Sequence, residues 1–153
     1  MHTDIGLIIS IASDHAGVEL KEFITQKLQD HGARVAQVID QGPFTSDRVD
    51  YPDYARKVCE SILNHQAHAG ILICGSGVGM SMMANRFHGI RCALVSEPTS
   101  AALSKQHNNS NVLSMGARLT GPDQAWACVE AWLRASYEGG RHDGRINKLD
   151  APL

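Results

Sequence analysis

Short apolar runs alternate with longer segments of helical period along most of the chain, and this alternation restricts the fold more than any other feature. Most runs are almost continuously apolar, which is typical of strands buried on both faces of a sheet. The expected strands cover residues 7–12, 34–39, 70–74, 91–96 and 111–116.

The segments between these runs carry apolar residues at three- and four-residue spacings, which predicts helices with one buried stripe. Their ends carry stop and start residues, such as glycine after a helix and proline in its first turn. The first two expected helices cover residues 20–28, with Gly32 as the stop, and the segment from Pro52 to Leu63. A third runs from the glycine turn to Phe87, and a fourth begins near Pro98 and ends at His107 and Asn108. A fifth reaches Leu133 and opens with the capping-box pattern Thr120-Gly121-Pro122-Asp123.

Strict alternation of strands and helices requires parallel strands joined by right-handed crossovers. We therefore predict the α/β class: one domain over residues 1–153, with a doubly wound, Rossmann-like, parallel five-stranded sheet flanked by helices. A helical tail, residues 138–153, follows and is set off by Gly139-Gly140. We expect a weak helix there at best, because Gly144 costs about 1 kcal/mol relative to alanine.

Charge and composition exclude several classes of protein. The formal net charge is −2, which argues against a general nucleic-acid or membrane surface. The N-terminus lacks a basic leader, and no apolar stretch approaches the ~20 residues of a membrane span. The four cysteines show no CxxC spacing, so we expect reduced thiols and a cytoplasmic protein.

Ligands of open α/β sheets bind at the carboxyl ends of the strands. Asp14 and His15 follow the first expected strand, and the stretch Cys74–Gly79 follows the third. His107 and Asn108 end a helix, so the pattern defines their place at this edge less well.

The glycine turn after Cys74 fits none of three familiar phosphate-binding motifs. Gly75, Gly77 and Gly79 free the backbone to aim successive N–H groups at an anion. Met80 stands where a dinucleotide fingerprint needs glycine and where a cysteine-phosphatase loop needs arginine. A Walker A loop would need a lysine that is missing. A tight turn with no ligand is the alternative.

A thiol on the first residue of such a turn can serve as a base or nucleophile. The alternative is a buried structural cysteine, and we assign that role to Cys59, Cys92 and Cys128, which fall within expected helices or strands. For Cys74, which faces the ligand edge, we favour a functional role.

The histidines and arginines supply further candidates. His15 and His107 are better placed than the remaining histidines, which we expect at the surface: His2, His31, His65, His68 and His88. No ligand pair has zinc-site spacing, so a zinc site of Cys74, His107 and Asp14 is disfavoured. Arg141 and Arg145 lie one helical turn apart, and His142 is adjacent. This arrangement is typical either of a solvated charged tail or of bidentate phosphate binding.

The chain resembles the ribose-5-phosphate isomerase B family, which also holds galactose-6-phosphate and allose-6-phosphate isomerases. The resemblance runs through nearly the whole chain in order: SDHAG (13–17), DYPDYA (50–55), GILICGSGVGMSMMANR (70–86), SEPTSA (96–101), QHNNSNVLSMGAR (106–118) and EGGRHDGR (138–145). Some relatives use a glutamate where this chain has Met80, so the sequence resembles the cysteine branch.

The resemblance implies a role for each candidate. Cys74 would be the base that moves a proton between C2 and C1, with Ser76 moving the hydroxyl proton. His107, assisted by Asp14, would open the sugar ring. The expected contacts to the substrate are Tyr51 and Asn108 to the sugar, the amides of Gly75, Gly77 and Gly79 to the enediolate, and His15, Arg118, Arg141 and Arg145 to the phosphate. His142 is a further expected substrate-binding residue.

The resemblance further implies a phosphorylated sugar as substrate, no metal or organic cofactor, and no nucleic-acid or membrane partner. It implies a homodimer or homotetramer with the site at the subunit boundary, on which the tail would pack. Two alternatives stay open: an isomerase of hexose 6-phosphates with the same base, and a phosphosugar-binding module without catalysis.

Overall fold

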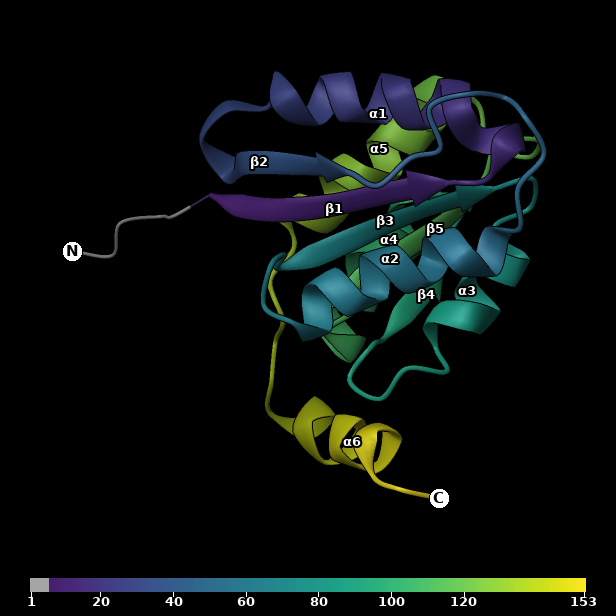
Figure 1. The fold of residues 1–153 in the computed structure, drawn as a ribbon. Coiled ribbons are helices and arrows are strands. Elements are labelled where there is room, and N and C mark those ends of the chain that lie inside the picture. The colour runs from purple at the N-terminus through teal and green to yellow at the C-terminus, as the bar shows by residue number, and fades with distance from the viewer. Residues whose placement is uncertain (1–5) are drawn as a thin grey trace.

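The computed structural model describes residues 6–153, and the expected surface position of His2 lies outside them. Within this range five parallel strands form one sheet in the order β2-β1-β3-β5-β4 (Figure 1). The strands are β1 (Leu7–Ser13), β2 (Val35–Asp40), β3 (Ala69–Cys74), β4 (Cys92–Leu94) and β5 (Val112–Gly116). The predicted fold class is therefore confirmed.

Helices cover both faces of the sheet. Their bounds are α1 (Val18–Gln29), α2 (Tyr51–Leu63), α3 (Val78–Ala84), α4 (Pro98–Asn108), α5 (Pro122–Arg134) and α6 (Arg141–Asp150), with short 3₁₀ turns η1 (His15–Gly17) and η2 (Gly32–Arg34). Helices α1, α4 and α5 pack on one face, whereas α2 and α3 pack on the other (Figure 1). No helix within residues 6–153 is both long and apolar enough to cross a bilayer.

Strand β3 shows why the strands read as continuous apolar runs. Ile71 and Ile73 point into the core beneath α1 and α5, while Leu72 and Cys74 point into the core beneath α2 and α3. All six residues of β3 are buried. Because both faces of the strand lie in a core, its sequence does not alternate between apolar and polar residues.

Two expected helix ends were wrong. Helix α3 ends at Ala84 instead of reaching Phe87, because the next residue, Asn85, pairs its side-chain amide with the backbone N–H and C=O of Cys92 at 2.8 and 3.0 Å. Helix α5 has Gly121 as its N-cap with no side-chain cap, so the capping box from Thr120 does not form. Thr120 is buried, and Pro122 presets the first helical turn.

The tail is a full helix, which corrects the expectation of a weak one. Helix α6 stands apart from the sheet at the end of an extended connection (Figure 1). Its Ile146 is buried, and Asp150 at its end forms an ion pair with Arg91 at 3.1 Å. These contacts offset the about 1 kcal/mol that Gly144 costs in a helix.

A buried ion pair fixes the end of β2 to α1. The Lys21 ammonium donates to both carboxylate oxygens of Asp40 at 2.8 Å. The Lys21 side chain is 1% exposed and the Asp40 side chain 26%, so water reaches only the acid. Asp40 also accepts from the Gly42 N–H at 2.9 Å, which holds the start of the following loop.

This asymmetry predicts which half of the pair matters more to stability. Asp40→Asn leaves the buried ammonium of Lys21 without a negative charge beside it, so we expect this substitution to lower the free energy of unfolding by about 3 kcal/mol. Lys21→Met leaves a carboxylate that water can reach and should cost about 1 kcal/mol. Urea unfolding at one protein concentration measures both, and a larger loss for Lys21→Met would contradict the interpretation.

Candidate active site

Parallel pairing brings three strand ends to one cavity. Ser13 of β1 lies opposite Ile73 of β3, and Cys74 lies opposite Gly116 of β5. The residues that follow these strands therefore meet at the carboxyl edge, around an open cavity of about 580 Å³. The cavity is lined by Asp14, His15, Ala16, Tyr51, Cys74, Gly75, Ser76, Val78, Gly79, Met82, Arg118 and Leu119.

The glycine turn aims its backbone at the sulfur of Cys74. The Gly77 N–H donates to Cys74 Sγ at 3.1 Å, a contact that stabilises negative charge on sulfur. Gly77 has a φ of +80°, and its C=O accepts from Ser114 Oγ at 2.6 Å. A Cβ there would lie 2.8 Å from Leu94 and from the Met115 backbone, so the turn requires glycine for both conformation and space.

The flanking glycines let two larger side chains approach the turn. A Cβ on Gly79 would lie 2.5 Å from the ring of Tyr51, and one on Gly75 would lie 3.5 Å from the Arg118 guanidinium. Ser76 is exposed to the cavity, and its Oγ accepts from the Val78 N–H at 3.2 Å. The turn therefore presents a hydroxyl, a phenol and a guanidinium around one thiol.

Asp14 and His15, which follow β1, also line the cavity. Asp14 is 8% exposed, and its Oδ1 accepts from the Ala16 N–H at 2.9 Å, which caps η1. His15 Nδ1 accepts from the Val49 N–H at 3.3 Å. A neutral His15 ring therefore carries its proton on Nε2, which makes that atom a hydrogen-bond donor.

The other predicted site residues lie at the opposite edge of the sheet. Helix α4 runs back from the carboxyl edge of β4 to the start of β5, so its end carries His107 and Asn108 away from Cys74. Arg141, His142 and Arg145 lie on α6. Within the described residues, none of these five lines the cavity of Cys74. A single chain therefore does not bring all the predicted site residues together.

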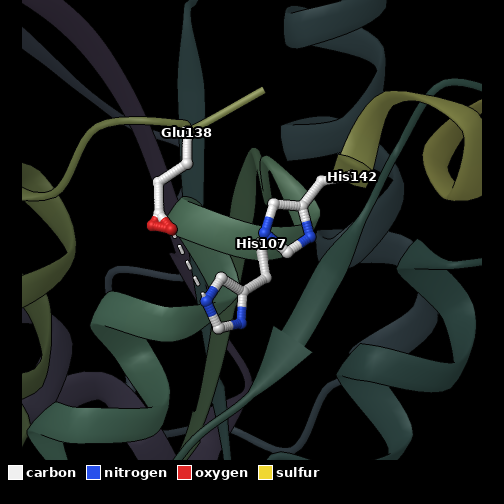
Figure 2. Close-up of side chains that lie close together, drawn as sticks. All are labelled: His107, Glu138 and His142. Carbon is white, nitrogen blue, oxygen red and sulfur yellow. Dashed lines mark ion pairs between the residues drawn. The ribbon is translucent and has the colours of Figure 1, made fainter. Parts of the chain in front are cut away.

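This second group is itself compact. The rings of His107 and His142 stack with centroids 4.6 Å apart and planes at 17° (Figure 2). Glu138 Oε1 lies 3.8 Å from His107 Nε2. Burial, and then the charge of Arg141, lower the pKa of His142 below its ordinary value.

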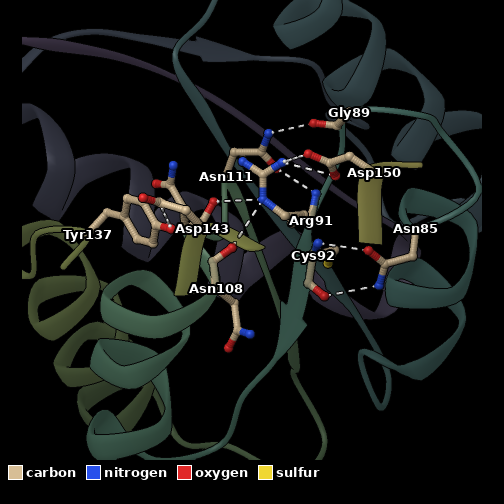
Figure 3. A network of polar contacts seen from close by, with 10 residues as sticks. Asn85, Gly89, Arg91, Cys92, Asn108, Asn111, Tyr137, Asp143 and Asp150 are labelled. Atoms are coloured by element: carbon tan, nitrogen blue, oxygen red, sulfur yellow. Dashed lines mark hydrogen bonds and ion pairs between the residues drawn. The ribbon is translucent and has the colours of Figure 1, made fainter. Parts of the chain in front are cut away.

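Polar contacts tie the second group to the sheet. The Arg91 Nε–H donates to the backbone C=O groups of Asn108 and Asn109 at 3.1 Å, while its Nη1 reaches Asp150 (Figure 3). Arg91 thereby links the end of α4 to the end of α6. Sequence reasoning assigned no role to Arg91 or Glu138, although Glu138 stands directly before the Gly139-Gly140 pair of the arginine-bearing tail.

The remaining thiols are unsuited to chemistry. Burial raises the pKa of Cys59 to about 12 and that of Cys128 to about 11. Burial also raises the pKa of Cys92, and the nearby Cys59 raises it further. The assignment of these three as structural thiols agrees with their surroundings.

The family model, the related sequences and the related structures all indicate the same protein family. Residues 9–149 match the model of the Ribose/Galactose Isomerase family. Ribose-5-phosphate isomerase B of Escherichia coli is 47% identical over 143 residues, which are 94% of each chain. Nearly the full length of the chain takes part in the match.

Solved structures share the fold. A ribose 5-phosphate isomerase B from Thermotoga maritima superimposes with a TM-score of 0.90 and 47% identity, over 94% of this chain and 97% of that one. The ribose-5-phosphate isomerase B of Mycoplasma genitalium with bound ribulose-5-phosphate gives a TM-score of 0.87 and 41% identity, over 94% and 93%.

The thiol environments predict selective alkylation. At about pH 8 iodoacetamide should modify Cys74 at least about tenfold faster than the other three cysteines, whose raised pKa values leave little thiolate. Mass spectrometry of peptides from a timed reaction gives the order. The Cys74→Ala protein serves as the control and should stay unmodified, and faster labelling of the partly exposed Cys92 would contradict the assignment.

Proposed function

Because the chain belongs to the Ribose/Galactose Isomerase family, we propose that it interconverts ribose 5-phosphate and ribulose 5-phosphate. The observation that carries the proposal is the place of Cys74. Its sulfur lines the cavity and accepts the Gly77 N–H at 3.1 Å, inside a glycine turn whose backbone borders the same cavity. A base and an oxyanion cradle at one point are what proton transfer next to a carbonyl requires.

The proposed reaction is a proton shuttle on the open-chain sugar. The Cys74 thiolate removes the proton from C2, the C–H electron pair forms the C1–C2 double bond, and the carbonyl pair moves onto O1. The amides of the glycine turn stabilise this enediolate. The exposed hydroxyl of Ser76 moves the proton from O2 to O1, and the Cys74 thiol returns its proton to C1, which leaves the ketone at C2.

The closed sugar ring needs an acid–base group of its own. We propose His107 for this step, because an imidazole can both donate and accept a proton and the side chain is 37% exposed. The exposed guanidinium groups of Arg141 and Arg145, one helical turn apart, would hold the phosphate. Binding energy at that remote end keeps the reacting carbons in register with the base.

Ring opening and phosphate binding require His107, Arg141 and Arg145, which lie away from Cys74 in one chain. We therefore propose a homodimer in which each active site contains residues of both subunits. The end of α4 and helix α6 of one subunit would close the cavity of Cys74 on its partner. The cavity rim supports this arrangement, since Val78, Met82 and Leu119 are apolar yet 38%, 64% and 73% exposed. The four free thiols suit a reducing compartment, and we propose the cytoplasm.

The test of the reaction pairs one substitution with a choice of substrates. The unmodified protein should convert ribose 5-phosphate with a higher kcat/KM than allose 6-phosphate or galactose 6-phosphate. Cys74→Ala should lower kcat about 10²–10⁴-fold while changing affinity by less than about tenfold. Normal turnover by that variant would remove Cys74 as the base, and a preference for a hexose phosphate would change the substrate.

The test of the shared site is recovery of activity in mixed dimers. Cys74→Ala and His107→Ala chains, each inactive alone, should regain about a quarter of the unmodified activity when co-expressed in equal amounts. Half of such dimers are mixed, and each mixed dimer holds one intact site. Recovery should be absent if each subunit builds its own site, and a monomer in light scattering would exclude sharing.

A further inference from the structure

Three potential metal ligands meet outside the cavity of Cys74. His107 at the end of α4, Glu138 in the connection and His142 on α6 each offer one ligand atom, and these atoms lie within 4.8 Å of one another. Figure 2 shows the Glu138 carboxylate directed at His107, with the two imidazole rings stacked. The backbone keeps the group together, since the Glu138 N–H donates to the Gln106 C=O at 3.0 Å.

One nitrogen of the group, Nε2 of His142, is buried without a hydrogen-bond partner among the described residues. His142 as a whole is 4% exposed. A buried polar atom left unpaired destabilises the folded state, so the site gains from any group that pairs with it.

We propose that His107, Glu138 and His142 form an inhibitory site for a divalent transition ion of the zinc class. Two imidazole nitrogens and one carboxylate oxygen are a ligand set that zinc accepts, with a fourth position open to water. Bonds of about 2.1 Å in a tetrahedron separate ligand atoms by about 3.4 Å. His107 Nε2 and Glu138 Oε1 are 3.8 Å apart. The stacked rings of His107 and His142 must turn for both nitrogens to face one ion, and the His107 and Glu138 side chains, each more than a third exposed, leave room for that movement.

Neighbouring charges make the site one for reversible binding. Arg141 and Arg145 on α6 are exposed cations that repel a metal ion, whereas Glu138 attracts it. The inhibitory part of the proposal rests on the proposed function, in which His107 acts on the sugar ring and its neighbours Arg141 and Arg145 hold the phosphate. An ion on the two imidazole rings and a phosphosugar would therefore compete, while metal binding itself does not depend on the reaction.

The test of binding uses Co²⁺ with the full-length protein. The unmodified chain should bind one Co²⁺ per chain and give the visible absorption of nitrogen and oxygen ligands, without the charge-transfer band of a cobalt–thiolate bond. Glu138→Gln and His142→Asn should each weaken binding at least about tenfold. His65→Asn is the matched control, because His65 is exposed and its φ of 60° suits asparagine.

Circular dichroism checks that the variants fold, and Glu138→Gln changes an exposed residue. Equal Co²⁺ affinity of Glu138→Gln and the unmodified protein would overturn the site, as would a thiolate band. In the second arm, Zn²⁺ should raise KM for ribose 5-phosphate with kcat unchanged, and Glu138→Gln should need at least about tenfold more Zn²⁺ for the same effect. Binding without this competition would overturn inhibition, whereas an inactive metal-free protein would count against the proposed function.

Discussion

The parallel pairing of β3 with β1 on one side and β5 on the other holds the cavity together. The ladder continues past the strands: the Asp14 N–H donates to the Ile73 C=O at 3.0 Å, and the Ala117 N–H donates to the Cys74 C=O at 2.8 Å. Backbone hydrogen bonds therefore position the carboxylate and the thiol at the edge of the sheet. Side-chain packing sets the finer arrangement, such as the Tyr51 ring against Gly79.

The sequence predicted those parts of the fold that depend on burial. Strands buried on both faces leave a continuous apolar run, and the ends of β1 and β3 follow directly, so Asp14 and Cys74 could be assigned to one edge. Helix ends were less predictable, because they depend on tertiary contacts. Asn85 ends α3 through a bond to Cys92, a residue seven positions on, which no local pattern reveals.

The structure differs most from the sequence-based expectations in the tail and in the residues that lie beside it. Local propensity argued for a weak helix at Gly144, but the buried Ile146 and the Arg91–Asp150 pair outweigh it. The grouping of His107 with His142 joins two segments with α5 between them, and only the three-dimensional structure reveals it. The separation of this group from Cys74 follows from helix direction, since a crossover helix returns to the amino edge of the sheet.

The extended connection between α5 and α6 has a consequence of its own. Residues 135–140 contain no regular helix or strand, and Gly139 and Gly140 both take positive φ values, 66° and 59°. The direction of α6 thus depends on two turns of the backbone that other residues adopt only with strain. The reach of α6 depends on how many residues precede those turns. Insertion or deletion of a single residue would relocate every charged group on the helix while leaving each side chain unchanged, so chain length here is a structural variable in its own right.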